Sequence, residues 1–386
     1  TLKDGIRNLI NRYLPASGIK PAQTSGLNDF ILELTIKDTE PVTKTFLPSL
    51  SLSPARLVAQ FDEKQARLNL HTEFSHVRYN KLTLNGYSLS VHSGDKLEIK
   101  SRANEFQFND AQKLYNLSFL SDAKNNLAQA KLVWNNYDEQ TYSGRLETRM
   151  TFSQPDEKNS HIEIKVLPAK IFIADSLWTV HPSIITIDST RIEVDHLKIS
   201  GHQDQYFMIN GVIAPDKTET INVQINNFSL NNLNLISGED LNLQGSLSGT
   251  ASVYDIYEKA FLLSNLKISG LGYSGRQMGN LSLLSKWDPP SESVQSELIV
   301  TDQDHQTLHA HGNYSPYRDS IDFTVDLDHF SLIVLEPVLK DVFDNVFGSA
   351  TGNVKIYGRP GKVLMKGDVF AENAGLKLGY IQTSYH

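Results

Sequence analysis

Cysteine is absent from the 386 residues, and no apolar run approaches the roughly eighteen residues that a membrane-spanning helix needs. The missing cysteines exclude a disulfide scaffold and favour a bacterial envelope or a reducing compartment. Basic runs are also missing. Lys and Arg are spread evenly and the formal net charge is −8, which argues against a nucleic-acid partner. A hydrophobic content of 40% with 21% charged residues is typical of a folded chain.

Signatures of enzymes are missing as well. The chain contains no GxSxG elbow, no HExxH helix and no P-loop. The Gly-rich stretch at 270–275 lacks the spacing of a dinucleotide loop, so we predict a turn there. We therefore expect no catalytic residue, no cofactor and no enzymatic activity. The chain starts at Thr1 without an initiator Met or a signal peptide, from which we expect a processed or excised piece of a longer protein.

What the sequence does contain is strict alternation. In IDFTVDLDHF (321–330), Ile321, Phe323, Val325 and Leu327 alternate with polar residues that are mostly aspartates. Successive side chains of a strand point to opposite faces, so this segment predicts a strand with one apolar and one acidic face.

The same alternation recurs along most of the chain, between breaks rich in Gly, Asn, Asp and Pro. Short strands joined by such turns predict antiparallel meanders and an all-β fold. The other alternating segments are 82–91, 95–101, 162–166, 192–200, 221–226 and 239–249.

Helical patterns are few. Residues 1–14 carry Ile6, Leu9, Ile10 and Tyr13 at helical spacing and predict an N-terminal helix. A second pattern at 333–348 has Pro337 suited to a first turn and Gly348 suited to a C-terminal cap. We predict a helix there that acts as a connector or an end cap. The segment 253–263 fits a short helix or a strand.

An internal repeat is also visible. The letters FSL at 228–230 precede GSLSGTASVY at 245–254, and FSL at 330–332 precedes GSATGNVKIY at 348–357. Each copy has a Gly-x-x-x-Gly pair entering an alternating strand, where glycine permits a close backbone approach. The sequence therefore predicts two repeat units, at about 228–287 and 330–386.

The apolar face of each predicted strand must leave water, and three arrangements achieve this. Two sheets can pack face to face, one sheet can close into a barrel, or one sheet can curl around an apolar interior. Alternation alone does not separate these arrangements.

A glycine pattern near the C-terminus narrows the choice. The run 335–385 has a Gly-small-x-Gly entry into a strand, further glycines after each following strand, then a small residue and a Tyr. In 176–213, a strand containing Trp178 leads through alternating strands and a polar hairpin to the strand INGVI. These patterns, over roughly 160–386, resemble the TamB family of bacterial translocation and assembly module proteins and the wider AsmA-like group. The residues at the C-terminal pattern positions are Gly348, Gly352, Gly358, Gly367, Ala374 and Tyr380.

The resemblance implies an elongated, curled antiparallel sheet of the β-taco type, a repeating β-groove with an apolar interior and one or two short helices. It also implies a location in the periplasm of a diderm bacterium, between the two membranes. The expected cargo is phospholipid acyl chains or a hydrophobic client such as nascent outer-membrane protein strands. Expected partners of the full-length protein are an outer-membrane barrel of the BamA family and the inner membrane, through an N-terminal anchor missing from these residues.

On this interpretation the chain has three parts: a helix at 1–14, a β-rich segment at 15–160 that continues the groove, and a TamB-like groove at 161–386. The inward side chains of its strands are the predicted lipid-binding residues. They are Ile162, Ile164, Val166, Ile192, Val194, Ile221, Val223, Ile225, Leu241, Leu243, Ile321, Phe323, Val325, Leu327, Val354 and Ile356.

Two other interpretations fit parts of the sequence. DHQTLHAHGN places His305, His309 and His311 on one strand face near Asp302 and Asp304, as a zinc site could be. Because no cysteine and no firm fourth ligand accompany them, the sequence favours a polar outer face and no metal. The alternative function is a carbohydrate-binding or adhesive β-sandwich of the cell surface. A sugar platform would need its Trp residues clustered, whereas the three here are spread along the chain.

Overall fold

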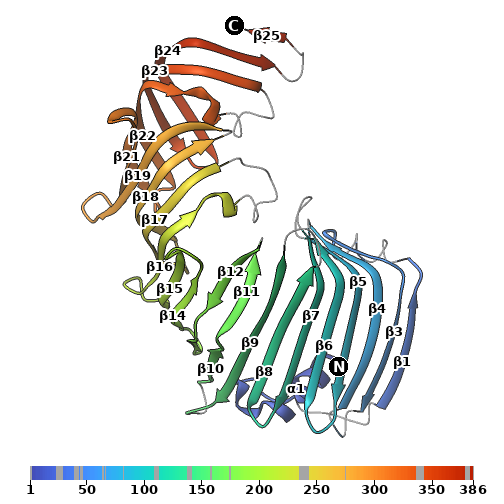
Figure 1. Ribbon diagram of the computed structural model, residues 1–386. Coiled ribbons are helices and arrows are strands. Elements are labelled where there is room, and N and C mark those ends of the chain that lie inside the picture. The colour runs from blue at the N-terminus through green and yellow to red at the C-terminus, as the bar shows by residue number, and fades with distance from the viewer. Residues whose placement is uncertain are drawn as a thin grey trace. The chain divides into compact units, whose positions relative to one another are not determined.

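The computed structural model describes residues 2–22, 29–38, 43, 47–62, 65, 67–80, 82–107, 113–136, 141–156, 159–173, 175–233, 243–273, 275–335, 343–378 and 383–385. Most of these residues lie in antiparallel strands, which confirms the all-β class (Figure 1). The chain divides into two units, Thr1–His202 and Gln203–His386, and each unit contains an antiparallel sheet. Within the described ranges, no helix is long and apolar enough to cross a membrane.

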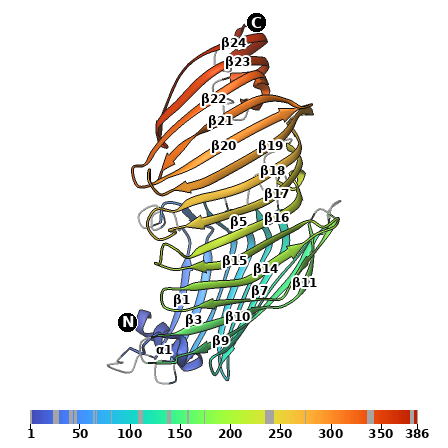
Figure 2. The same ribbon diagram turned by 90° about the vertical axis from the view of Figure 1, so that its left-hand side faces the viewer.

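The first unit starts with the predicted helix, α1 (Leu2–Tyr13), and the 3-10 turn η1 (Pro15–Ser17). Strands follow, and tight turns such as Asn125-Asn126, both at positive φ, join consecutive ones. The sheet is curled, as comparison of Figures 1 and 2 shows. Its strands are β1 (Asp29–Ile36), β2 (Leu50–Leu52), β3 (Ala55–Asp62), β4 (Arg67–Tyr79), β5 (Leu82–Ser93), β6 (Leu97–Gln107), β7 (Lys113–Lys124), β8 (Leu127–Asn136), β9 (Tyr142–Ser153), β10 (His161–Val166), β11 (Ala169–Ile173), β12 (Ser176–Val180), β13 (Ser183–Ile187) and β14 (Ile192–Ser200).

Proline divides three of these long strands. Pro54 separates β2 from β3, and both pair with β4. Pro168 separates β10 from β11, and both pair with β9, while Pro182 separates β12 from β13, and both pair with β14. Proline has no N–H to donate to a ladder, so the chain leaves its neighbour at the proline and rejoins it afterwards.

The predicted parts of the chain, with a groove that continues across residue 160, are not the two units of the structure. β9 pairs with β10 across residue 160, so the strands on both sides of that position belong to one sheet. The boundary lies instead between His202 and Gln203. Alternation continues without change through residue 160, which is why the sequence pattern alone does not locate the boundary.

The second unit is a meander in which each strand pairs with the next along the chain. The short 3-10 turn η2 (Leu332–Leu335) follows β22. The strands of the second unit are β15 (Tyr206–Ile213), β16 (Thr220–Ser229), β17 (Leu243–Tyr254), β18 (Phe261–Tyr273), β19 (Arg276–Asp288), β20 (Ser293–Asp302), β21 (His305–Ser315), β22 (Ser320–Ser331), β23 (Phe343–Arg359), β24 (Lys362–Leu378) and β25 (Thr383–Tyr385).

The helix predicted at 333–348 is wrong at its C-terminal end. Residues 343–348 open strand β23, and Phe347 lies opposite Gly375 of β24. Gly348 does not cap a helix, because it lies inside the strand, where an added Cβ would meet the Cα of Ala374 at 2.4 Å. Pairing with a neighbouring strand here outweighs helical periodicity. Only η2 is helical at the start of the segment, and residues 336–342 lie outside the described ranges.

Two other predictions have clear outcomes. The ambiguous segment 253–263 is the end of β17, a turn and the start of β18. The Gly-rich stretch at 270–275 lies at the hairpin between β18 and β19, with Gly275 at φ +78°. The turn expected there is confirmed.

The internal repeat has a structural counterpart. In the first copy the ladder between β16 and β17 shifts register before Phe228, and in the second the ladder between β22 and β23 shifts before Phe330. The residue preceding each Phe has a φ of 49°. The N–H of Asn227 donates to Ser248 Oγ over 2.8 Å, and the N–H of His329 donates to Thr351 Oγ1 over 3.0 Å. Both copies thus contain the same β-bulge, in which a backbone N–H donates a hydrogen bond to a hydroxyl of the next strand.

The glycine that follows each hydroxyl is required by backbone contact. Gly249 has a φ of +138° and Gly352 a φ of +151°, and a Cβ would meet a neighbouring carbonyl oxygen at 2.0 Å and 2.2 Å, respectively. We expect Gly352→Ala to lower the free energy of unfolding by about 2 kcal/mol or more, because the backbone must shift. Gly361 has nothing within 4 Å of an added Cβ, so Gly361→Ala should change stability by less than about 0.5 kcal/mol. Urea unfolding of both variants checks this, and equal effects would contradict it.

Candidate functional site: the apolar faces of the two sheets

One face of the sheet in the first unit is apolar, and we call it the first apolar face. It can be followed along a row of directly opposed residues from β1 to β10, in which only two members are hydroxylated and the rest are aliphatic. The row is Leu32, Ala59, Leu70, Val91, Ile99, Ser121, Ala130, Thr148 and Val166.

Helix α1 covers one end of the first apolar face. Leu9 and Tyr13 are buried there against Leu97, Ala123 and Ala128 of the sheet. The helix is amphipathic, and of the residues whose spacing predicted it Leu9 and Tyr13 are buried against the sheet, whereas Ile6 is 42% exposed. Figure 1 shows it beside the ends of the strands at the bottom of the view.

Polar contacts attach this helix to the strand turns at the same end. Tyr13 donates from its hydroxyl to the Gly94 carbonyl over 2.8 Å, and the Asn126 N–H donates to the Tyr13 carbonyl over 3.0 Å. Arg12 donates to the carbonyl of Gln65. These contacts reach three successive turns of the sheet, so α1 and its neighbours close one end of the apolar face.

Away from α1 the first apolar face is open. Leu32 and Leu34 are each 42% exposed, and Phe119 is 37% exposed. Each large apolar side chain left in water costs roughly 1.5–3 kcal/mol relative to burial. An open face of this kind is typical of a surface that binds something apolar.

The predicted residues of the first unit lie on this face. Ile164 lies opposite Met150 on one side and Ile185 on the other, and Ile185 in turn lies opposite Val194. In the same way, Ile187 lies opposite Ile162 of β10 on one side and opposite Ile192 of β14 on the other. The five predicted residues brought together here, all partly buried, are Ile162, Ile164, Val166, Ile192 and Val194.

The sheet of the second unit has its own apolar face, the second apolar face. A row of directly opposed residues crosses ten successive strands and contains only apolar side chains and glycine. At about 4.8 Å per strand this row is on the order of 40 Å long. The row is Phe207, Ile225, Gly249, Leu266, Leu283, Leu298, Ala310, Val325, Val354 and Gly367.

One side of the second apolar face is covered by the chain itself. Phe330, which ends the second repeat bulge, and Leu230, which lies two residues after the Phe228 that ends the first, are buried there with Leu271, Met278 and Val300. The chain that follows each bulge therefore packs apolar side chains against the apolar face of its own sheet. Between this cluster and the opposite side of the face, most apolar side chains are only partly buried.

The opposite side ends in a stack of aromatic rings. Phe261 stacks on Tyr254 at 5.4 Å and on Trp287 at 4.6 Å between ring centroids, and Tyr317 meets Trp287 edge-on. The rings pack on one another, so this Trp contributes to packing and does not offer a flat platform. Asp255 is buried beside the stack.

A hydrogen bond and an ion pair engage that buried carboxylate. The Tyr317 hydroxyl donates to Asp255 over 3.1 Å, and the Lys217 ammonium lies 3.7 Å from Asp255 and 2.6 Å from Glu258. Burial raises the pKa of the Tyr317 phenol, and the hydrogen bond to Asp255 raises it further. The hydrogen bond to Glu258 raises the pKa of Lys217. The cluster forms a polar border to the second apolar face.

The predicted residues of the second unit also share one face. Phe323 lies opposite Ile356, and Val325 lies opposite Val354, on adjoining strands. Leu241 lies outside the described residues. The others brought together, all partly buried, are Ile221, Val223, Ile225, Leu243, Ile321, Phe323, Val325, Leu327, Val354 and Ile356.

Sequence reasoning missed part of both faces. Leu266, Leu283 and Leu298 complete the second row, and their own segments alternate, so the same signal could have found them. Gly249 and Ala310 carry no hydrophobic signal, and only the cross-strand register places them on the face.

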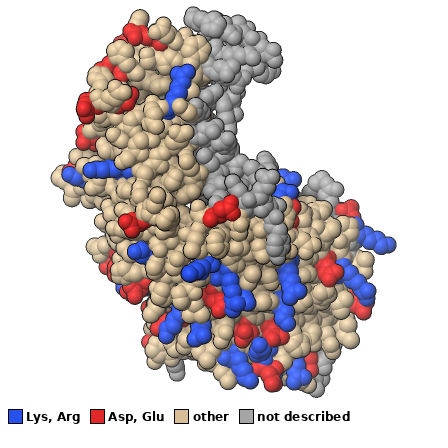
Figure 3. Space-filling model, viewed as in Figure 1, with Lys and Arg blue, Asp and Glu red and all other residues tan. Residues whose placement is uncertain are grey.

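The opposite face of each sheet is polar. In the first unit, Glu33 pairs with Arg56 at 2.9 Å and Lys165 with Glu163 at 3.1 Å, and in the second Lys355 lies 3.1 Å from Asp322. Figure 3 shows charged side chains of both signs spread over the strands of the first unit that face the viewer. Such exposed pairs contribute little stability, so this face acts mainly as a solvated surface.

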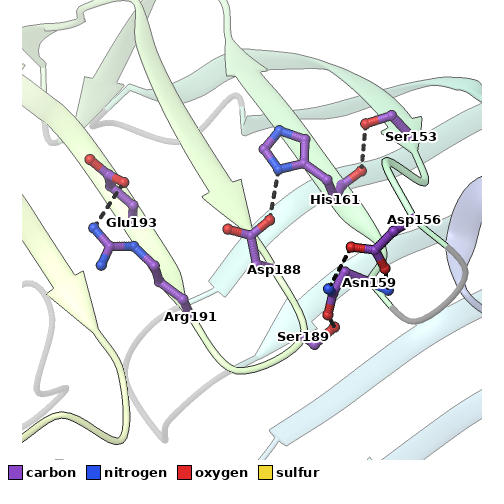
Figure 4. A network of polar contacts seen from close by, with 8 residues as sticks. All are labelled: Ser153, Asp156, Asn159, His161, Asp188, Ser189, Arg191 and Glu193. Atoms are coloured by element: carbon purple, nitrogen blue, oxygen red, sulfur yellow. Dashed lines mark hydrogen bonds and ion pairs between the residues drawn. The ribbon is translucent and has the colours of Figure 1, made fainter.

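A polar network between two turns of the first sheet contains a histidine, an aspartate and a serine (Figure 4). The ring of His161 lies 2.7 Å from the Asp188 carboxylate. Ser153, however, donates its hydroxyl to the backbone carbonyl of His161 over 3.5 Å and not to the imidazole. A nucleophile must contact its base, so these three residues do not form a Ser-His-Asp arrangement. The network links two turns of the sheet, with Arg191 and Glu193 paired beside it.

These features define a class of protein: all-β, built from curled antiparallel sheets, each with one apolar and one charged face. Comparison with known proteins adds no relative to it. No protein-family model matches the chain, and neither a curated protein nor a solved structure does. The assignment to this class therefore rests on the geometry of the sheets.

Proposed function

We propose that the protein is a non-enzymatic component of a bacterial envelope whose apolar sheet faces shield phospholipid acyl chains from water. The observation that carries the proposal is the second apolar row, which crosses ten strands from Phe207 to Gly367 without a charged or polar member. The large side chains of this row are only partly buried, and a long apolar surface of this kind is typical of one that binds an apolar occupant.

The energy scale fits such an occupant. Moving an acyl chain of sixteen carbons into water costs on the order of 12 kcal/mol, at about 0.8 kcal/mol per methylene. A face of Ile, Val, Leu and Phe side chains removes most of that cost without any specific polar contact. One leaflet's hydrocarbon depth is about 15 Å, which is shorter than the second apolar row. Headgroups can stay in water at the open side, so no basic pocket is required.

The absence of polar members along the row also suits movement of the cargo. Cargo on an apolar surface meets similar side chains at successive strands, so no one position holds it strongly. Deep pockets with hydrogen-bond donors would trap it instead. Transfer along the sheet then needs no catalytic residue.

The sequence resemblance to the TamB family extends the proposal to the cellular setting. It supports a periplasmic protein of a diderm bacterium that carries lipid between the inner and outer membranes. On the same basis, nascent outer-membrane protein strands are a second hydrophobic client. A BamA-family barrel and an inner-membrane anchor would be the attachments of the full-length protein.

The test is lipid extraction from the purified chain followed by mass spectrometry. We expect phospholipid at a reproducible ratio to protein, and we expect washing with detergent to remove it and added vesicles to restore it. A protein that stays free of lipid in both steps, with cross-links joining two packed sheets, would contradict the proposal. That outcome would favour the carbohydrate-binding or adhesive β-sandwich.

A further inference from the structure

Histidines gather on the charged face of the second unit, on the side of the sheet away from the second apolar face. His309 and His311 project from β21 on the same face, two residues apart. Asp326 of β22 lies directly opposite His309, and Glu297 of β20 lies directly opposite His311. Three adjacent strands thus bring two imidazoles and two carboxylates together. We call these four residues the histidine cluster.

The geometry of the cluster is close to that of a metal site. One ligand atom each from His309, His311 and Asp326 lies within 4.8 Å of the others. In a tetrahedral zinc site with bonds of about 2.0–2.1 Å, the ligand atoms are roughly 3.3 Å apart. Closing that difference needs side-chain rotations only, since the strands already hold the Cα atoms in place. His309 and His311 are ring neighbours, with centroids 4.8 Å apart.

Glu297 completes the arrangement. Its carboxylate lies 2.9 Å from Nε2 of His309, so it holds one ring nitrogen and leaves the other for an ion. A carboxylate that holds the second nitrogen of a ligating histidine is a recurrent feature of zinc sites, because it fixes the ring and raises its basicity. Asp326 is positioned in a similar way by Asn353, whose amide donates to it over 2.6 Å.

We propose that His309, His311 and Asp326 bind a transition-metal ion, with Zn²⁺ the best fit, and that Glu297 positions His309. Two imidazoles and one carboxylate favour Zn²⁺, Ni²⁺ or Cu²⁺ over Mg²⁺ and Ca²⁺, which prefer all-oxygen sites. Three protein ligands leave a fourth position for water. The site is independent of the proposed lipid surface, because it lies on the other face of the sheet.

The ion would hold adjacent strands of the second unit together. Its ligands come from β21 and β22, and Glu297 ties β20 to the same centre. Binding to the folded chain and not to the unfolded chain stabilises the fold in proportion to the logarithm of ion concentration. Zinc would therefore strengthen the central strands of the second unit without touching the apolar face.

A neighbouring group, His305, Asp328 and His329, meets the same distance limit and provides an internal comparison. His305 lies 2.8 Å from one carboxylate oxygen of Asp328, and His329 lies 2.6 Å from the other. Both oxygens of this carboxylate are engaged by imidazoles, and His329 also lies 3.6 Å from Glu372. An ion would have to displace these contacts. We therefore expect the histidine cluster to bind the ion before this group does.

The experiment is calorimetric titration of the 386-residue chain with Zn²⁺, alone and in excess Mg²⁺. We expect one ion per chain at micromolar concentration or below, no competition by Mg²⁺, and a rise in melting temperature with zinc. His309→Gln with His311→Gln should weaken binding by at least about tenfold, because both imidazoles are lost. His305→Gln with His329→Gln, which removes the same number of histidines, should leave the affinity within about threefold.

Each outcome decides the proposal. Failure of the unmodified chain to bind zinc overturns it, as does stronger loss in the His305 and His329 variant or equal loss in both. Circular dichroism shows whether each variant is folded. If the His309 and His311 variant does not fold, Asp326→Asn takes its place, with the same tenfold loss expected.

Discussion

Replacing Val325 and Val354 together with Asp should reduce co-purifying phospholipid by tenfold or more. The two residues lie directly opposite each other on β22 and β23, at the eighth and ninth of the ten positions of the second apolar row. Two carboxylates there would face the acyl chain, and a buried, unpaired charge costs several kcal/mol. The cost exceeds what an acyl chain gains over a few strands, so the row would be interrupted. Lipid extraction and mass spectrometry measure the loss.

A matched control separates this effect from a general effect of charge. Thr324 and Lys355 are the neighbouring directly opposed pair, one residue along, with side chains on the polar face. Thr324→Asp with Lys355→Gln changes the net charge by −2, as the double Val variant does, and should leave the lipid content unaltered. Equal loss in both variants, or no loss in either, would contradict the apolar face as the lipid surface. Urea unfolding shows whether each double variant is folded, so that the lipid content is compared between folded proteins.

The second large effect concerns helix α1. Leu9 is 4% exposed and packs against Leu97, Ala123 and Ala128, so Leu9→Asp should detach the helix from the sheet. Removing the buried leucine alone costs about 2–5 kcal/mol, and the unpaired carboxylate adds to this. We expect a severalfold rise in binding of a hydrophobic dye and faster proteolysis at Arg12. The strand signal in circular dichroism should persist, because only one end of the first apolar face lies under the helix.

Ile6 provides the control on the same helix. It is 42% exposed, so Ile6→Asp introduces the same charge without removing a buried contact. A carboxylate near the start of a helix is neutral or slightly favourable toward the helix dipole. Dye binding and proteolysis should match the unmodified protein. Should Ile6→Asp expose as much apolar surface as Leu9→Asp, the assignment of α1 as a cover would be wrong.

Together these expectations describe a sheet protein whose charged and apolar faces have different roles. The charged face keeps the protein in water and holds the candidate metal site. The apolar faces are covered only in part, by α1 in the first unit and by the residues that follow the repeat bulges in the second. A sandwich would instead bury most of such a face under a second layer, whereas Leu32 and Leu34 are each 42% exposed.

Some of this could be predicted from single segments. Ile162 and Ile164, or Phe323 and Val325, share a face because strand side chains alternate with period two whatever the rest of the chain does. Helix α1 was predicted for a similar reason, since Ile6, Leu9 and Tyr13 mark a helical stripe. The same reasoning gave the wrong prediction, a helix, for residues 343–348. Their apolar spacing fits a helix as well as a strand, and pairing with β24 decided between the two.

The sequence by itself determined the two-faced strands, the antiparallel all-β class, the N-terminal helix and the repeat of Gly249 and Gly352, because each depends on neighbours a few residues apart. Tertiary structure alone decided the rest. It placed Asp326 beside His309, aligned the apolar rows across ten strands and left those faces partly uncovered. These features depend on the register between strands and on what covers a sheet. Register and covering arise from contacts between residues far apart along the chain, which local alternation does not encode.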